Sequence, residues 1–244
     1  MLGTTLKHGT FVPLYYQLRE IIEKKIDSGE WKPGDKIPSE NDLRTSYDVS
    51  RNTAQKAINE LVSEGLLERR QGKGTFVSRP KIDQSLSSFY SFSKVMSDKG
   101  MEPKDIILNL DVEKVNYKIA KELNINVNDE VVTLQRIRTA NGEPIIFETS
   151  YIPSALMPDL SITDLEQGSL YDLMENKYGI TVSKAIEAFE PVLSRKEESH
   201  YLEIEPGSPS LLLDRTAFDL TGRPVEFCRS MVRGDRCRFY TELL

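Results

Sequence analysis

Hydrophobic residues in the first part of the chain recur at helical spacing in three segments. The first begins at Pro13 and ends before Gly29, the second covers residues 40–47, and the third follows Ser50 and stops at Gly65. Within each segment, apolar side chains lie three or four positions apart, which places them on one face of a helix. The pattern therefore predicts three amphipathic helices joined by short turns.

Capping and turn signals support these boundaries and add a hairpin. Ser39 and Asp42 have the spacing of a capping box at the start of the second helix. Two short strands follow the third helix, at residues 66–69 and 75–77, and the glycine-rich residues 71–74 join them. Three helices followed by such a hairpin form a winged helix-turn-helix.

A polar, serine-rich stretch at residues 78–88 separates this unit from the rest of the chain. Such a composition is typical of a linker. We therefore expect a winged helix-turn-helix domain at residues 10–78, a linker at 79–88 and a second domain at 89–244.

The second domain contains a weak internal repeat with an offset of about 79 residues, the size of a supersecondary unit. For example, Arg136 recurs as Arg215. Each copy reads as a helix, a turn and a hairpin of two strands, and Asn141-Gly142 is a strong hairpin signal in the first copy. A helix near 170–178 and a strand near 185–192 lie between the hairpins. This order predicts an α+β fold with helices packed on an antiparallel sheet, and a duplicated sheet offers two related clefts for a ligand.

Charge is unevenly distributed along the 244 residues, whose net charge is -6. Residues 1–80 hold 13 Lys and Arg against 11 Asp and Glu, a net charge of +2, whereas the remainder carries −8. Only the first part therefore has a field that suits a polyanion. Apolar runs are only a few residues long and the N-terminus lacks a secretory pattern, so we expect a cytoplasmic protein without a membrane span.

The third predicted helix carries a polar face suited to DNA. Its members are Arg51, Asn52, Gln55, Lys56 and Asn59. Arg and Lys neutralise phosphates, whereas Asn and Gln pair with adenine in the major groove. Ser50 begins this helix, where free N–H groups suit a phosphate oxygen, and the Gly72-Lys73-Gly74 tip is slim enough to reach the minor groove or the backbone. A lone helix with such a face is usually just solvated, but its place beside a basic hairpin favours DNA recognition.

Two arginines in the second domain suggest an anion site. Arg136 and Arg138 lie two apart on a predicted strand and so face the same side. Two guanidinium groups held close together repel each other unless an anion lies between them. The alternatives are a pair of surface arginines, or salt bridges to Glu148 across the hairpin.

Further polar residues strengthen the anion interpretation. Residues 87–91 precede a predicted helix start, where free N–H groups favour a phosphate or carboxylate. Ser169 and Tyr171 open another helix, and Glu148 and Glu226 can accept hydrogen bonds from sugar hydroxyls or an amine. Metal and catalytic chemistry find little support, since the two histidines are far apart and the two cysteines read as packed residues.

Several motifs occur in order along the first domain. They are Pro33-Gly34-Asp35-Lys36-Ile37-Pro38-Ser39-Glu40, Val49-Ser50-Arg51-Asn52-Thr53, Glu64-Gly65-Leu66-Leu67 and Gly72-Lys73-Gly74-Thr75-Phe76-Val77. This series resembles the GntR family of bacterial regulators. The second domain is similar to the effector domain of the HutC subfamily, whose fold resembles chorismate lyase. That similarity is carried by Arg136-Ile137-Arg138, Gly142-Glu143-Pro144, Glu148-Thr149-Ser150-Tyr151-Ile152-Pro153 and Arg233-Gly234-Asp235.

The resemblance implies particular DNA contacts: Arg44, Arg51, Thr53 and the Gly72-Lys73-Gly74 tip. The family's recognition helix commonly reads Ser-Arg-x-Thr-Val-Arg, and this chain has Ala54-Gln55 for the last two. Replacing an Arg that reads guanine with a Gln that prefers adenine should shift the operator sequence.

The resemblance also implies an effector pocket of the kind found in sugar-phosphate-responsive members. Its lining would comprise Phe89, Tyr90, Ser91, Arg136, Arg138, Glu148, Ser169, Tyr171 and Glu226. The chain departs from the subfamily at Val232 and Cys237, where tyrosines are common. A changed rim points to a different ligand.

Together these observations predict a homodimeric regulator, more readily a repressor than an activator, that binds double-stranded operator DNA and responds to a small anion such as a phosphorylated sugar or amino sugar. No cofactor, metal or membrane is expected, and no catalytic residues. Two alternatives stay open: a constitutive DNA-binding protein whose second domain only dimerises, and an enzyme on a lyase-like fold.

Overall fold

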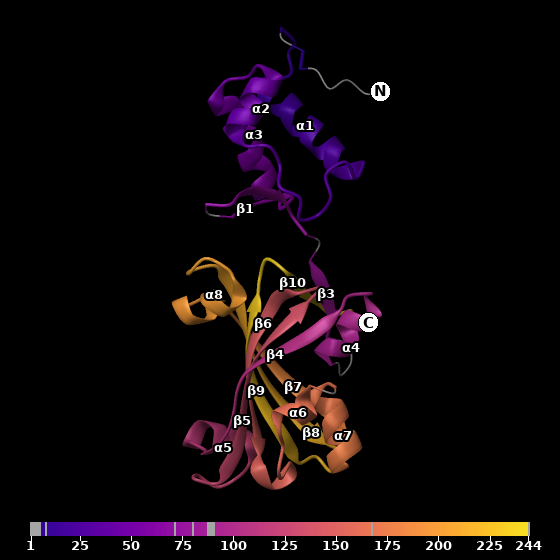
Figure 1. The fold of residues 1–244 in the computed structure, drawn as a ribbon, viewed down its shortest axis with the longest axis vertical. Coiled ribbons are helices and arrows are strands. Elements are labelled where there is room, and N and C mark those ends of the chain that lie inside the picture. Colours follow the sequence, from indigo (N-terminus) through magenta and orange to yellow (C-terminus); the bar gives the residue numbers. More distant parts are fainter. Residues whose placement is uncertain are drawn as a thin grey trace. The chain divides into compact units, whose positions relative to one another are not determined.

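The computed structural model describes residues 6–7, 9–70, 72–79, 81–86, 91–166 and 168–243. The chain divides into two compact units, Met1–Pro80 and Lys81–Leu244 (Figure 1). Each unit has its own buried hydrophobic clusters. A transmembrane helix is absent from the described part of the chain, where every helix is too short or too polar to span a bilayer.

Three helices form most of the first unit. They are α1 (Leu14–Asp27), α2 (Glu40–Tyr47) and α3 (Arg51–Ser63). At the start of α2 the Ser39 hydroxyl accepts from the Asp42 N–H and the Asp42 carboxylate accepts from the Ser39 N–H, which confirms the predicted capping box. Asp48 ends α2 in the left-handed conformation, so the chain turns sharply into α3.

A two-stranded wing follows the helices. Strands β1 (Leu67–Arg70) and β2 (Gly74–Val77) pair antiparallel. The segment before α2 runs along β2, with the Ile37 N–H donating to the Thr75 carbonyl at 3.0 Å and the Val77 N–H donating to the Asp35 carbonyl at 2.9 Å. These bonds anchor the hairpin to the helices, and the winged helix-turn-helix is confirmed.

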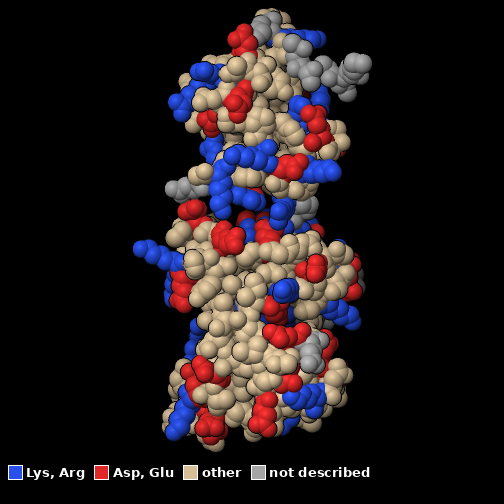
Figure 2. All heavy atoms as spheres, in the orientation of Figure 1, with Lys and Arg blue, Asp and Glu red and all other residues tan. Residues whose placement is uncertain are grey.

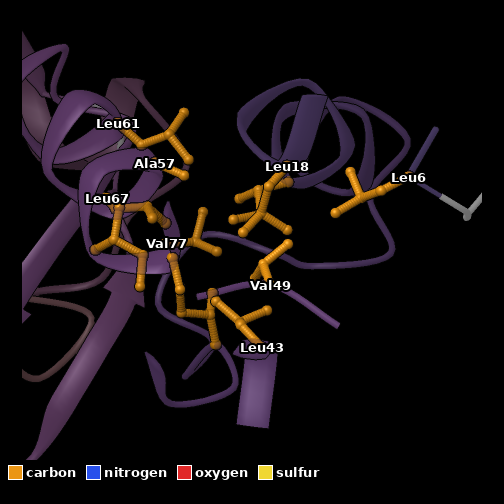
Figure 3. Packing of buried hydrophobic residues seen from close by; sticks show 12 residues of the cluster. Leu6, Leu18, Leu43, Val49, Ala57, Leu61, Leu67 and Val77 are labelled. Carbon is orange, nitrogen blue, oxygen red and sulfur yellow. The ribbon is translucent and has the colours of Figure 1, made fainter. Parts of the chain in front are cut away.

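The core of the first unit draws on all of these elements. Leu18 of α1, Leu61 of α3 and Val77 of β2 converge in Figure 3 and are almost fully buried. Burying such side chains provides the main driving force for folding. It also fixes the orientation of α3, so that its opposite face is directed to solvent.

The second unit is built on a six-stranded antiparallel sheet. Its strands, in spatial order, are β4 (Pro103–Lys114), β5 (Glu130–Ala140), β6 (Glu143–Pro153), β9 (Pro224–Arg233), β8 (Pro209–Asp219) and β7 (Val182–Leu193). The β5–β6 turn places Asn141 at φ 51° and Gly142 at φ 74°. Two successive left-handed residues define a type I′ turn, which explains why Asn-Gly predicted this hairpin correctly.

The internal repeat is visible as a pseudo-two-fold arrangement of this sheet. β4 begins at residue 103 and β7 at 182, α5 (Tyr117–Leu123) at 117 and α8 (Lys196–Leu202) at 196, and β5 at 130 and β8 at 209. The offset is 79 residues in each case. β6 and β9 meet at the centre, so the two halves of the sheet mirror each other in strand order.

Helices cover both faces of the sheet. α4 (Phe92–Asp98), α6 (Ile162–Leu165) and α7 (Leu170–Tyr178) lie on one side in Figure 1, and α5 and α8 lie on the other. A single 3-10 turn, Ser154–Leu156, precedes α6. α4 and α7 each pack into a separate apolar cluster, because charged residues occupy the sheet between them.

The start of the second unit differs from the sequence interpretation. Residues assigned to the 79–88 linker include a strand, β3 (Ile82–Ser85), which pairs in parallel with β10 (Cys237–Tyr240). Ile82 and Gln84 are buried on one side of β3. With only one apolar residue in four, the alternation that marks a strand was hidden among polar side chains.

Replacing Leu61 tests the packing of the first unit. Leu61 is fully buried, so Leu61→Ala should lower the free energy of unfolding of this unit by about 2–5 kcal/mol. The single tryptophan, Trp31, packs against the same cluster and makes a selective fluorescence probe for urea unfolding. Asn59→Ala, on the exposed face of the same helix, should change stability by less than about 0.5 kcal/mol. Equal midpoints of urea unfolding for Leu61→Ala and Asn59→Ala would contradict this packing.

Candidate DNA interface and effector site

The polar face of α3 is directed to solvent. Arg51, Asn52 and Gln55 are exposed, whereas Ala54 and Ile58 are buried in the core. The exposed and the buried residues lie on different faces of the helix. Because the buried face packs against α1, the polar face is directed to solvent. The face is thus free to enter a major groove, which a helix fits.

Three predicted DNA contacts already have intramolecular roles. The Ser50 hydroxyl accepts from the Thr53 N–H at 3.1 Å and lies 2.8 Å from the Thr53 hydroxyl, so it caps α3. The Lys56 Nζ lies 3.7 Å from the centre of the Tyr15 ring, a cation–π contact to α1. These side chains support the recognition helix as well as facing solvent.

Other basic side chains are more available to DNA. Within the described part of the chain, Arg44, Arg51 and Lys73 are exposed and make no ion pair. In contrast, Arg69 of the wing donates to Glu40 at 2.9 Å. On the face drawn in Figure 2, basic side chains gather at the end of the first unit that carries β1. Three of the predicted contacts are therefore exposed cations that make no ion pair with the described residues.

The wing tip depends on glycine. Gly72 has φ 68° and Gly74 has φ 120°, conformations that other residues seldom adopt. A Cβ atom on Gly74 would also lie 2.7 Å from the Cε atom of Lys36. The Lys73 N–H donates to the Arg70 carbonyl at 3.0 Å, which closes the turn and leaves the Lys73 side chain at its tip.

A buried ion cluster occupies the centre of the sheet in the second unit. Arg136 on β5 donates to Glu148 on β6 through Nε at 2.9 Å and through Nη2 at 2.5 Å. Its Nη1 donates to Asp105 on β4 at 3.0 Å. Arg136 is 3% exposed and Glu148 5%, so these are interior charges. Of the alternatives raised by the sequence, the salt bridge to Glu148 is present, and the surface location is wrong.

Arg138 belongs to the same cluster but makes longer hydrogen bonds and ion pairs. Its Nε donates to Asp105 at 3.2 Å and its Nη2 donates to the Ser93 hydroxyl at 3.2 Å, whereas its Nη1 lies 3.7 Å from Glu148. The guanidinium also stacks over the Phe92 ring at 4.7 Å. Arg136 is therefore held more tightly than Arg138, which retains donors for another acceptor.

A small, partly open hollow lies beside this cluster. It is lined by Ser91, Arg136, Arg138, Glu148, Ser169, Leu170, Tyr171, Arg215, Glu226 and Cys228. Seven of the nine predicted effector residues are in this lining, and the other two, Phe89 and Tyr90, lie outside the described residues. The fold thus brings together side chains from positions far apart in the sequence.

Additional hydrogen bonds order other side chains that line the hollow. The Tyr171 hydroxyl donates to Glu226 at 2.6 Å, and Arg215 donates to Glu187 through Nε at 2.6 Å. The Ser169 hydroxyl accepts from the Asp172 N–H at 3.2 Å, which caps α7 at its N-terminus. The positive end of the α7 dipole therefore lies at the rim.

Burial and charge shift the pKa values of these groups in opposite directions. Burial alone raises the pKa of Glu148, but Arg136, Arg138 and hydrogen bonds from Arg136 and Ser230 outweigh it and lower the pKa to about 2. Burial, with Glu226 nearby, raises the pKa of Tyr171 well above its usual value. Glu148 is consequently an anion and Tyr171 a neutral donor at neutral pH.

The cysteines are protonated thiols. Burial raises the pKa of Cys228 well above its usual value and that of Cys237 to about 12. The thiolate is the nucleophilic form, so neither residue suits covalent catalysis at neutral pH. No cluster of three potential ligands for a metal occurs among the described residues.

Four residues of the hollow and its ion cluster were not predicted: Asp105, Leu170, Arg215 and Cys228. Asp105 faces Arg138 through the β4–β5 register, which no local motif encodes. Arg215 pairs with Cys228 on neighbouring strands, as Arg136 pairs with Glu148. The internal repeat carried this signal, because Arg215 is the counterpart of Arg136.

A change at Glu148 tests the ion cluster through the pH dependence of stability. Folding lowers the pKa of Glu148 to about 2. The carboxylate therefore stabilises the folded state at pH values above the ordinary pKa of a glutamate, and this stabilisation is lost as the pH falls toward 2. Glu148→Gln should cost about 3–5 kcal/mol at pH 7 and should flatten the loss of stability on acidification. Urea unfolding followed by circular dichroism between pH 7 and 3 measures both effects, with Glu190→Gln on an exposed position of β7 as the matched control. A steep acid dependence that persists in Glu148→Gln would count against this cluster.

The comparisons with known proteins agree with this architecture. Residues 14–77 match the model of "Bacterial regulatory proteins, gntR family", and residues 98–238 match the "UTRA domain". The HTH-type transcriptional repressor NagR of Bacillus subtilis is 35% identical over 93% of both chains. The probable fructoselysine utilization operon transcriptional repressor of Escherichia coli is 32% identical over 89% of this chain and 90% of its own.

A solved structure extends the similarity to the fold. The crystal structure of PhnF from Mycobacterium smegmatis shares 27% identity with a TM-score of 0.63, and the match covers 93% of this chain and 99% of that one. These matches place the chain among DNA-binding regulators and not among enzymes. The chain belongs to the GntR family of bacterial regulators, with the UTRA effector domain expected for the HutC subfamily.

Proposed function

We propose that this protein is a homodimeric repressor that leaves its operator when the second unit binds a small anionic metabolite, such as a phosphorylated sugar or amino sugar. The buried cluster of Arg136 and Arg138 beside the hollow carries this proposal. Relatives named as repressors of fructoselysine utilization and of mannosyl-D-glycerate metabolism support a sugar-derived ligand. A protein that acts on bacterial operators works in the cytoplasm.

The chemistry of the hollow supports an anion with hydroxyl groups. Arg138 and residues at the N-terminus of α7 both line this space, and a phosphate accepts hydrogen bonds from both kinds of donor. Glu148 and Glu226 supply acceptors for sugar hydroxyls or an amine. Both charge types in one small hollow favour a ligand that is anionic at one end and donates hydrogen bonds at the other.

The exposed face of α3 supports operator recognition. Arg51 and Gln55 are both exposed on α3. An exposed arginine can bind a phosphate or a guanine, and an exposed glutamine can pair with adenine. Two such helices in a dimer read two half-sites of a pseudo-palindrome. Ligand and DNA binding are then thermodynamically coupled, so each weakens the other by the same factor.

Substituting Arg51 tests the DNA interface. With operator DNA selected from a random duplex library, Arg51→Ala should weaken binding about 5-fold to 150-fold, the range for losing one good base or charged contact. Fluorescence anisotropy at fixed salt measures the affinity. Arg195→Ala removes the same charge from an exposed position of the second unit and should leave the affinity nearly unchanged. If both variants bind alike, α3 is not the reading element.

A second test addresses the effector. Glucosamine 6-phosphate should raise the melting temperature of the protein and release it from the selected DNA, because a ligand that favours one state shifts the equilibrium toward it. Arg136→Ala and Arg138→Ala should abolish both effects. Arg229→Ala, which removes an arginine paired with Asp214 on the opposite sheet face, should retain them. DNA release that persists without both site arginines would refute the pocket assignment, and DNA binding unaffected by any metabolite would favour the constitutive alternative.

A further inference from the structure

A second, larger hollow adjoins the charged one. Four residues line both spaces: Arg138, Glu148, Arg215 and Cys228. The remaining lining consists of Ile82, Gln84, Phe92, Met96, Ile146, Leu213, Ser230, Cys237 and Phe239. The two hollows are therefore compartments of one site, separated by the side chains that they share.

The chemistry of the second compartment is apolar. Most of its walls are aliphatic, aromatic or thiol side chains from β3, α4, β6, β8 and β10, and Met96 and Ile82 are almost fully buried. The polar groups are already engaged: the Ser230 hydroxyl donates to Glu148 at 2.9 Å and the Gln84 amide donates to the Ser85 carbonyl at 2.8 Å. An apolar wall gains most from an apolar occupant, since water there lacks polar partners.

The two chemistries meet at one contact. The Arg138 guanidinium lies 4.7 Å above the Phe92 ring, so the charged compartment passes into the apolar one at this pair. Of the two hollows, the apolar one is the larger. A ligand that used only the charged space would leave the larger compartment unfilled.

We infer that the effector is bipartite: a phosphorylated sugar or amino sugar that carries an apolar acyl, alkyl or aryl substituent, with the substituent seated among Phe92, Leu213 and Cys237. This inference rests on the proposed function and specifies its ligand class. It also gives β3 a role in sensing, because Ile82 and Gln84 form part of the wall and β3 is the first strand of the second unit.

An N-acyl series of glucosamine 6-phosphate tests the inference. The full-length protein is titrated calorimetrically with the N-acetyl, N-butanoyl and N-hexanoyl derivatives and with the parent compound. Each methylene buried in an apolar space tightens binding by about fourfold. Because the N-hexanoyl chain is about four methylenes longer than the N-acetyl group, burial of only about half of the added chain should tighten binding roughly tenfold. Equal affinity along the series overturns the inference, whereas binding of the parent compound alone still supports the proposed function.

A substitution that fills the apolar compartment with a larger side chain provides the variant that matches this ligand series. Cys237→Phe should cancel the gain from the hexanoyl chain and leave the affinity for glucosamine 6-phosphate within about twofold, because Cys237 does not line the charged hollow. Val112→Phe adds the same ring at an exposed site on β4 and should keep the full gain. Melting without ligand checks folding, and Leu213→Phe fills the same space from β8 if Cys237→Phe is unstable.

The remaining outcomes separate the two proposals. If N-hexanoyl glucosamine without phosphate binds and Cys237→Phe abolishes this binding, the apolar compartment is supported and the proposal that the ligand carries a phosphate is refuted. If neither the phosphorylated compounds nor the acylated ones bind, both the inference and its underlying function are overturned. A gain from the hexanoyl chain that survives in both Cys237→Phe and Leu213→Phe places the substituent elsewhere and refutes the inference.

Discussion

The buried ion pair between Arg136 and Glu148 constrains the rest of the second unit. Charges removed from water must be paired, and here Asp105, Arg138 and Ser230 complete the pairing around them. Apolar helices cannot pack over such a cluster, so α4 and α7 form separate cores on either side of it. The charged hollow is thus the gap that this arrangement leaves. The site exists because the middle of the sheet is charged, and the apolar compartment exists because α4 begins beside it.

The two units solve different physical problems. The first must present polar side chains on a rigid support, and it does so by burying one face of α3 and capping its start with Ser50. The second must bind a ligand in its interior, where every polar group needs a partner before the ligand arrives. Arg138, with longer contacts than Arg136, is the side chain best placed to change partners at low cost. A rigid first unit and a second unit in which Arg138 can exchange its partners are properties that suit a ligand-controlled switch.

Local signals explain which features the sequence predicted. The capping box at Ser39 and the Asn141-Gly142 turn are set by a few adjacent residues, and both elements appear where they were expected. Asp105 was not predicted, because it lies 31 residues from its partner Arg136 and meets it only through the register between β4 and β5. β3 was also missed, since a buried Gln84 in place of a hydrophobic residue removes the alternation. The roles of individual residues in binding stay predictions, because contact with a ligand is not encoded in the pattern of the free chain.

The pairing of β3 with β10 has a consequence for synthesis of the protein. Domains begin to fold as they leave the ribosome, in order from the N-terminus. The first unit forms its hydrophobic core from its own 80 residues, so this core does not need residues that are synthesised later. β3 emerges directly after it but must wait for residues 237–240, at the other end of the second unit, before its hydrogen bonds can form. The nascent chain therefore carries a folded DNA-reading head before its sensor is closed, and closure of the sensor is one of the last events of its biogenesis.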